Sequence, residues 1–342
     1  ALDRARALLD QGQVADALEI TAALAAGPEP GHRALALHST ALKAQGRREE
    51  ALVFDEQATR RFPTSGVAWH NLAATLGDLG RGPASVQAME QAFRLGLNGP
   101  QSWGVMARAR AAAGDLDGAE QAYRETLRRA PGQAATAIEY ADVLWMRRGD
   151  VAEAQAVLDA CAHAGGPPAQ LLLAKAKLLQ AAGQGDQAAA FLALAAARLP
   201  DEPALTMAAS QAALELGRLD DAERLALSVE TRLPQSPGVL NQSVIIHLAR
   251  GRADLALAKA RKGLELDPGN QSLWGWAATA ARAAGDPLHA ELCDYDALVG
   301  ASDIATPQGW PDLAAYLADL AAALNLSLIH ISEPTRQAEI SY

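Results

Sequence analysis

The tripeptide His289-Ala290-Glu291 is the pattern in this sequence closest to a metal site. A non-haem Fe(II) centre takes two histidines and one carboxylate on one face of the metal. The tripeptide lies in a predicted helix, where residues i and i+2 point in different directions, so its two side chains do not converge on one ion. The only later histidine is His330, and the remaining histidines have no partner at metal-ligand spacing. We therefore expect His289 and Glu291 to face solvent, and the chain to hold no metal or other cofactor.

Three further patterns contain residues that could act in thiol chemistry, glycosylation or phosphate binding. Their positions within or between predicted helices explain them better than such functions do. The two cysteines, Cys161 and Cys293, fall in predicted helices at positions typical of small core residues, so we expect buried structural thiols. Asn241-Gln242-Ser243 matches a glycosylation acceptor but lies inside a predicted helix. Gly183-Gln184-Gly185 lacks the Lys and the Ser or Thr of a phosphate-binding loop. The sequence thus shows no catalytic residues, and we expect that the chain itself is not an enzyme.

The elements that carry these residues follow a fixed period marked by glycine. The spacing is 34 residues at every step except one of 35, and the marker positions are Gly12, Gly46, Gly80, Gly114, Gly149, Gly183, Gly217, Gly251 and Gly285. Five residues after each marker lies a small residue, which is alanine everywhere except at Ser85. A fixed period of this length is the signature of stacked structural repeats.

Each copy predicts two helices joined at its glycine. Apolar residues at i, i+3, i+4 and i+7 precede the glycine, and a second such stripe follows it, as in Trp69, Leu72, Ala73 and Leu76, and in Ala119, Tyr123, Thr126 and Leu127. Glycine can adopt the left-handed conformation that ends a helix. Asp115, Asp150 and Asp286 are expected N-caps of the helices that follow. Proline seventeen residues after the marker should end the second helix, at Pro63, Pro131, Pro200, Pro234 and Pro268.

This pattern resembles the tetratricopeptide repeat (TPR) family. The family motif of aromatic, small, Gly, Ala, aromatic and Pro is matched by Trp103, Ala107, Gly114, Ala119, Tyr123 and Pro131. The departures are Leu97 and Gly166 in place of Pro, and Ile138, Leu172 and Leu240 in place of Trp. The resemblance covers roughly residues 1–299 and implies an all-α, right-handed solenoid of about nine helix-turn-helix repeats, in which each repeat buries its apolar face on a neighbour.

Composition and charge exclude several classes of function. The net charge of −10 argues against nucleic acid, whose binding needs clustered Lys and Arg, and against an anionic membrane surface. The same charge and the 34-residue period disfavour an RNA-reading helical repeat. Two cysteines exclude a disulfide framework, and no uncharged apolar run reaches the roughly 18 residues that predict a transmembrane helix. We expect a cytoplasmic protein, although the chain starts at Ala1 rather than Met, which leaves its natural start open.

The period stops after residue 299. We expect the last second helix at about residues 287–299, a loop over 300–311 and a helix over 311–324. Three segments here resemble the junction at which, in bacterial proteins, a TPR array leads into a 2-oxoglutarate/Fe(II) oxygenase domain: residues 291–295, 307–310 and 312–316. Residues 326–336 resemble translated sequencing-adapter DNA, the alternative being a natural disordered tail. The expected organisation is an array over 1–299 with a clipped first repeat, a segment over 300–325 leading toward a missing domain, and a non-native tail over 326–342.

The TPR resemblance also implies where a partner would bind. In the family the first helices line the concave face, and residues ten and six before each glycine point into it. The polar candidates at these positions are His70, Arg108, Glu139, Lys177, Gln211 and Asn241. They do not reproduce the Lys, Asn and Arg set of the carboxylate-clamp subfamily or the asparagine ladder of glycosyltransferase arrays, and solvated surface polarity is the alternative explanation for them.

We therefore expect a scaffold that binds a protein or peptide on its concave face, with no nucleic-acid or membrane partner and an open oligomeric state. The alternative is the recruiting arm of a longer oxygenase, whose iron ligands would lie beyond Asn325.

Overall fold

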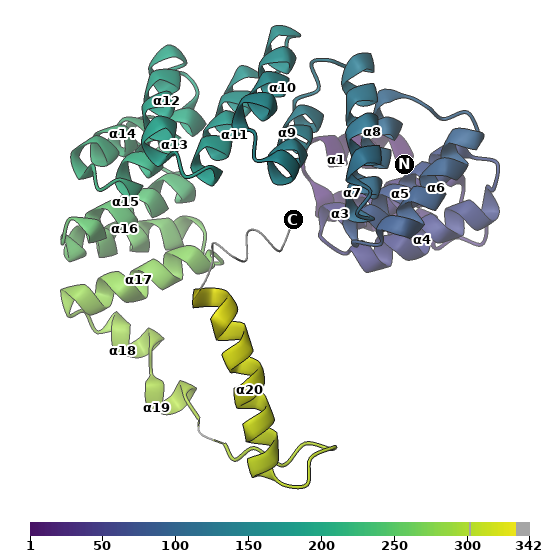
Figure 1. Ribbon diagram of the computed structural model, residues 1–342. Coiled ribbons are helices and arrows are strands. Elements are labelled where there is room, and N and C mark those ends of the chain that lie inside the picture. Colours follow the sequence, from purple (N-terminus) through teal and green to yellow (C-terminus); the bar gives the residue numbers. More distant parts are fainter. Residues whose placement is uncertain (301, 333–342) are drawn as a thin grey trace. The chain divides into compact units, whose positions relative to one another are not determined.

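The structure, a computed structural model, describes residues 1–300 and 302–332, and for residues 325–332 only the backbone. Every regular element over these residues is a helix. The helices alternate along the chain as first and second members of repeating pairs (Figure 1). This confirms the predicted all-α solenoid of helix-turn-helix repeats.

The first helices of the pairs are α1 (Leu2–Asp10), α3 (His32–Ala44), α5 (Gly66–Asp78), α7 (Pro100–Ala112), α9 (Ala134–Arg148), α11 (Pro168–Ala181), α13 (Pro203–Glu215), α15 (Pro237–Ala249) and α17 (Gln271–Ala284). The second helices are α2 (Val14–Ala25), α4 (Arg48–Arg61), α6 (Gly82–Arg94), α8 (Leu116–Arg129), α10 (Val151–His163), α12 (Gly185–Arg198), α14 (Leu219–Arg232), α16 (Ala253–Leu266) and α18 (Leu288–Leu292). Beyond them lie α19 (Tyr295–Leu298) and α20 (Leu313–Ser332).

The marker glycines set the turn inside each pair. All nine have positive φ, between 63° at Gly149 and 81° at Gly114. This left-handed conformation reverses the chain at little steric cost only when no Cβ is present. The predicted caps are also confirmed: Asp115 accepts a hydrogen bond from the Gly118 amide, Asp150 from the amides of Ala152 and Glu153, and Asp286 from that of Leu288.

The small residue five positions after the marker lies where the two helices of a pair meet. It has 0% exposure in the first eight pairs, at Ala17, Ala51, Ser85, Ala119, Ala154, Ala188, Ala222 and Ala256. Ser85 fits because its hydroxyl donates to the Ala73 carbonyl at 2.7 Å. Ala290 in the ninth pair is exposed, because α18 ends after five residues and offers little surface to pack.

The prediction of one continuous helix over residues 287–299 is wrong. The backbone leaves the helical region at Cys293, and Asp294 starts the separate helix α19 by accepting a hydrogen bond from the Ala297 amide. Cys293 is therefore half-buried between two short helices, and not a core residue within one helix. The helix predicted over 311–324 is present as α20, which continues to Ser332. Of the predicted tail, residues 333–342 lie outside the described part of the chain.

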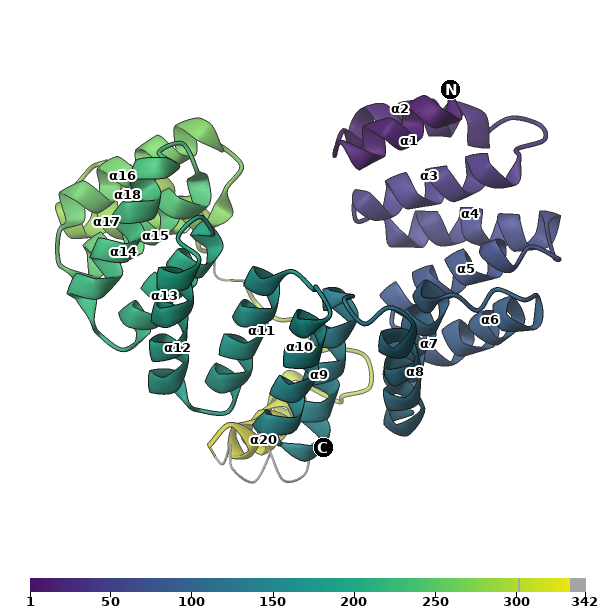
Figure 2. The ribbon, with the colours of Figure 1, turned by 90° about the horizontal axis from the view of Figure 1, so that it is seen from above.

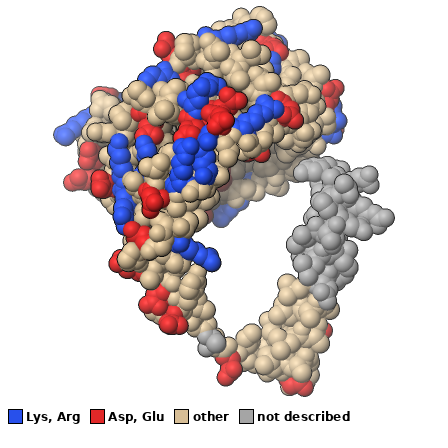
Figure 3. Space-filling view, turned by 90° about the vertical axis from the view of Figure 1, so that its left-hand side faces the viewer, with Lys and Arg blue, Asp and Glu red and all other residues tan. Residues whose placement is uncertain are grey.

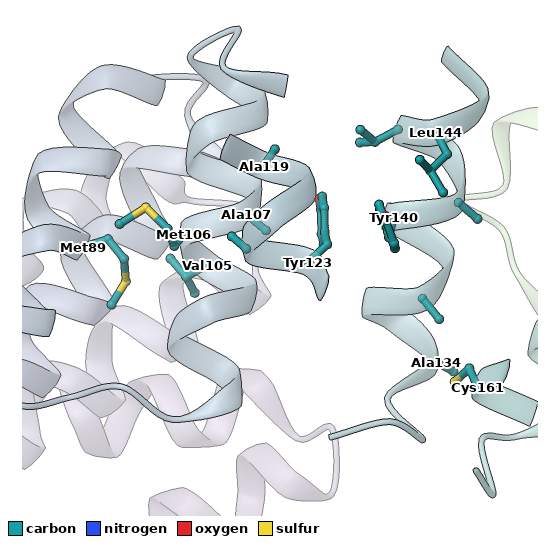
Figure 4. Packing of buried hydrophobic residues seen from close by; sticks show 14 of the residues in the cluster. Met89, Val105, Met106, Ala107, Ala119, Tyr123, Ala134, Tyr140, Leu144 and Cys161 are labelled. Atoms are coloured by element: carbon teal, nitrogen blue, oxygen red, sulfur yellow. The ribbon is translucent and has the colours of Figure 1, made fainter. Parts of the chain in front are cut away.

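The chain divides into two compact units, Ala1–Leu178 and Leu179–Tyr342. The first has the largest continuous core, in which Met89, Met106 and Leu144 are almost fully buried. Within it the rings of Tyr123 on α8 and Tyr140 on α9 stack with centroids 5.7 Å apart (Figure 4). In the second unit, α13 lies between α12 and α14 (Figure 2), and Leu240 and Leu273 are fully buried.

Candidate functional site

Three of the predicted groove residues lie on successive first helices of the first unit: His70 on α5, Arg108 on α7 and Glu139 on α9. The Arg108 guanidinium lies 3.4 Å from both carboxylate oxygens of Glu139, a long contact between partly exposed groups. The Glu139 carboxylate also acts electrostatically on the phenol of Tyr123 on α8. Burial, reinforced by this carboxylate, raises the pKa of Tyr123, so the phenol remains protonated at neutral pH.

His70 provides one of the buried polar atoms of the first unit that lack a partner within the described part of the chain; Trp103 Nε1 on α7 and Gln133 Oε1 are others. Its Nδ1 is buried and has no hydrogen-bond partner among the described residues. Burial lowers the pKa of His70, and the positive charges of Lys43 on α3 and Arg108 lower it further. The ring is therefore neutral at pH 7 and can accept or donate one more hydrogen bond. We call Lys43, His70, Arg108 and Glu139, together with Tyr123 of the second helix α8, the first-helix cluster.

Local interactions hold the helices that carry this cluster. Ser65 caps α5 by accepting a hydrogen bond from the Ala68 amide. One turn further on, the Trp69 indole donates to the Pro63 carbonyl at 2.9 Å, which ties the start of α5 to the end of α4. Trp69 and Pro63 belong to the repeat pattern, so the second contact is one that the repeat itself supplies.

The other three predicted groove residues have separate surroundings. Lys177 is exposed on α11, and its charge acts on Asp142 of α9, whose pKa burial raises and Lys177 lowers. In the second unit, the Gln211 amide donates to Glu215 on its own helix at 2.9 Å. Asn241 accepts a hydrogen bond from Ser272 on α17 at 3.3 Å. The six predicted residues thus form one cluster of three and three separate polar positions.

Charged residues outside positions ten and six before the glycine also interact with the predicted residues of the first unit. Lys43 lies three residues before Gly46 and Asp142 seven before Gly149. Asp55 was missed as well: it lies nine residues after Gly46, where later repeats carry Met89, Tyr123, Leu158 and Leu192. A carboxylate among apolar residues at one repeat position was the signal that could have found it.

Asp55 is 1% exposed and accepts hydrogen bonds from Ser39 at 2.8 Å and Thr75 at 2.6 Å. The Lys43 ammonium lies 3.9 Å away. Burial raises the pKa of Asp55, while Lys43 and the two hydroxyls act in the opposite direction. Because the charge of Lys43 also lowers the pKa of His70, Lys43 links this buried network electrostatically to the first-helix cluster.

Charged side chains elsewhere join neighbouring helices. Glu120 on α8 is 4% exposed and binds Arg124 at 2.5 Å, Arg147 at 2.8 Å and Arg148 at 2.9 Å. In the second unit, Arg252 pairs with Glu223 at 2.6 Å. Basic and acidic side chains are interleaved over the face seen in Figure 3. These pairs satisfy one another and connect repeats.

The residues considered for metal or thiol chemistry have structural surroundings. Glu291 is exposed, but His289 is half-buried with an unpartnered Nδ1, because it packs in the short α18 and does not face solvent as predicted. Cys161 is 2% exposed, and burial raises the pKa of its thiol, as expected for a structural cysteine. Among the described residues, no group of three or more His, Cys, Asp or Glu side chains could hold a metal ion. Nor does any helix of this part of the chain have the length and apolar character needed to cross a membrane.

Comparisons with known proteins agree with this architecture. A tetratricopeptide repeat family model matches residues 70–134, 104–169 and 173–237. A comparison with curated proteins found no match.

Solved structures with the same fold include yeast Tom70, with a TM-score of 0.58 and 14% identity over 92% of this chain and 68% of that one. A TPR protein from Parabacteroides merdae has a TM-score of 0.47 and 14% identity over 73% of this chain and 98% of that one. A chain of the APC/C hetero-tetramer Cut9-Hcn1 has a TM-score of 0.45 and 16% identity over 81% of this chain; the match spans only 54% of that chain. The family match and the helix pair that recurs from α1 to α18 show that this chain carries tetratricopeptide repeats and folds as a TPR solenoid.

Proposed function

We propose that the chain is a binding scaffold that holds a segment of a partner protein against the first helices of its first unit. The observation that carries this proposal is the first-helix cluster. It contains a buried ring nitrogen of His70 without a partner and a long, partly exposed pair between Arg108 and Glu139 at 3.4 Å. Buried polar atoms are usually satisfied, so a turn of the half-buried His70 ring would let a ligand supply the missing hydrogen bond.

The groups in the cluster suit binding better than catalysis. Neutral His70 has no carboxylate partner to orient it as a general base, and the nearest charges, Lys43 and Arg108, oppose its protonation. The Arg108 and Glu139 side chains are 46% and 35% exposed, and such pairs contribute little to stability. Either partner can therefore turn toward a peptide. Lys177 would extend the contact along the first helices of the first unit, while Gln211 and Asn241 are polar positions on first helices of the second unit.

A charge swap tests this proposal while keeping an ion pair between α7 and α9. The double variant Arg108→Glu/Glu139→Arg keeps opposite charges on the two helices but reverses the sign of the charge that each helix offers to a ligand. A photo-crosslinking amino acid at position 74, one turn from His70, should capture a partner with the native chain and lose it with the swapped one. Arg60→Glu, which alters the more exposed Arg60–Glu56 pair on α4, serves as the control and should retain capture. Equal capture by all three proteins would place the binding surface elsewhere.

The recruiting arm of a 2-oxoglutarate/Fe(II) oxygenase remains a separate hypothesis about sequence beyond Asn325, and no feature of the described helices favours it. An uninterrupted genomic reading frame is its test: a downstream His-x-Asp and a second distant histidine would support it, and a stop codon shortly after Asn325 would exclude it.

A further inference from the structure

The second unit contains a trough that differs from the first-helix surface in position and chemistry. It lies between the second helices α12 and α14, with α13 as its floor, and has a volume of about 610 Å³. We call it the α12–α14 trough. Its lining follows α14 from Arg218 to Arg232, so at 1.5 Å per residue it extends about 21 Å. Ligand-binding pockets typically have volumes of about 300–1,000 Å³.

Four alanines on α12 make the trough possible: Ala189, Ala193, Ala196 and Ala197 line one wall. They lie six, ten, thirteen and fourteen residues after Gly183, and the second helix of no other repeat has alanine at all four positions. The corresponding residues after Gly114 are Glu120, Arg124, Leu127 and Arg128. The corresponding space between α8 and α10, lined by Arg124, Leu127 and Arg128, is smaller, with a volume of about 250 Å³. The floor, at Thr206, Ala209 and Ala213, is also built from small buried residues.

The rim of the trough is positively charged in an acidic protein. Its charged lining residues are Arg218, Arg224, Arg232 and Asp221, and with Asp186, which pairs with Arg218, the rim has a local excess of one positive charge against a net charge of −10 for the chain. Arg218 pairs with Asp186 at 2.6 Å and Arg224 with Asp221 at 2.9 Å, with arginine side chains 49% and 68% exposed. Arg232 donates to the Pro200 carbonyl at 2.6 Å. Because exposed pairs of this kind contribute little to stability, an incoming carboxylate can compete for these guanidinium groups.

We propose that the α12–α14 trough is a docking site for an acidic amphipathic helix of a partner protein. A helix fits because its own backbone hydrogen bonds are satisfied, whereas the trough walls are helices with no free backbone groups to pair with an extended strand. An apolar stripe at i, i+3, i+4 and i+7 would fill the alanine-lined space, and carboxylates beside the stripe would meet the arginines. A single acyl chain fits less well, since the trough is open along its length and would leave one side of the chain in water.

The test is a selection with a matched counter-selection. A displayed library of 16-residue helical peptides with randomised surface positions is selected on the full chain and counter-selected on Ala193→Leu/Ala197→Leu. Both alanines are exposed on the wall, so leucine fills the trough without entering the core. Ala190→Leu, on an exposed position of α12 outside the trough, is the control for the added leucine. Arg224→Glu tests the rim, and Arg60→Glu, with an ion pair of similar exposure on α4, is its control.

We expect selected peptides to share an apolar stripe at helical spacing and a net negative charge. Their affinity should fall at least about tenfold on the filled variant, fall on Arg224→Glu in a salt-dependent way, and remain unchanged on both controls. The proposal is overturned if no peptide distinguishes the native from the filled chain, or if those that do are basic or proline-rich and extended. Dodecanoate is titrated in parallel: calorimetric binding that the filled variant loses, without any discriminating peptide, would assign the trough to an acyl ligand.

Discussion

Replacing Ala119 by leucine should destabilise the first unit, whereas the same replacement at Ala290 should have little effect. Both alanines lie five residues after a marker glycine, but Ala119 has 0% exposure between α7 and α8, and Ala290 is exposed. Leucine is larger than alanine by an isopropyl group, which has no free space at a closed helix contact. Overpacking of this kind costs about 1–3 kcal/mol, while a surface substitution usually stays within about 0.5 kcal/mol.

The expected loss converts into a measurable shift of the melting temperature. For a cooperative unit of about 150–250 residues, 1 kcal/mol corresponds to about 2–4 °C. The first unit, Ala1–Leu178, falls in this range, so Ala119→Leu should lower its transition by about 2–12 °C. Far-ultraviolet circular dichroism follows the transition, and hydrogen exchange should show faster opening of α7 and α8. An unchanged melting temperature for Ala119→Leu, or equal shifts for the two variants, would refute the assignment of this repeat position as a closed helix contact.

Three further predictions concern single positions. Gly114→Ala forces a side chain into a residue with φ of +81° and should lower the free energy of unfolding, measured in urea, by about 1–2 kcal/mol. Gly275→Ala, at an open position inside α17, should instead raise it by up to about 1 kcal/mol. Equal effects of the two variants would contradict the role of the turn glycine. Burial raises the pKa of Asp55 above the value in the unfolded chain, so the protonated carboxyl stabilises the fold below about pH 4, and this stabilisation is lost as the pH rises through the folded pKa. Asp55→Asn should weaken this pH dependence of the urea midpoint. Parallel curves of midpoint against pH for the native protein and the variant would contradict this prediction. Glu120→Ala removes the shared carboxylate of three arginines whose side chains are 23–58% exposed, so it should destabilise by about 1–3 kcal/mol, with hydrogen exchange increasing first in α8 and α9; an unchanged midpoint would show that solvent already screens the network.

The local geometry of each repeat could be predicted from the order of residues because short-range sterics determine it. The marker glycines, spaced 34 residues apart with one step of 35, predicted the nine left-handed turns, and Asp115, Asp150 and Asp286 cap the helices that follow. Each of these features depends on a residue and its neighbours within one helical turn. The closed position five residues after the glycine was predictable too, since both helices that meet there belong to one repeat.

The ninth repeat shows where this reasoning stops. Ala290 and Cys293 follow the pattern in sequence, yet one is exposed and the other half-buried, because α18 ends after five residues. The repeat motif predicts burial of Ala290 and Cys293 only for a second helix of full length, and α18 is shorter than the other second helices. Whether the helix is completed depends on competing local signals, here the capping side chain of Asp294.

The sequence by itself determined the repeat, its helices and the list of polar residues on the first helices. Only the tertiary structure decided which of those residues meet. His70, Arg108 and Glu139 come from helices about 30 residues apart and form one cluster with Lys43 and Tyr123, whereas Gln211 and Asn241 have their own neighbours. The α12–α14 trough is also a product of stacking, since four alanines leave an open space only when a neighbouring repeat lies across from them. The physical reason is that periodicity specifies the face of a helix, while contacts between faces depend on the angle and distance at which successive repeats pack.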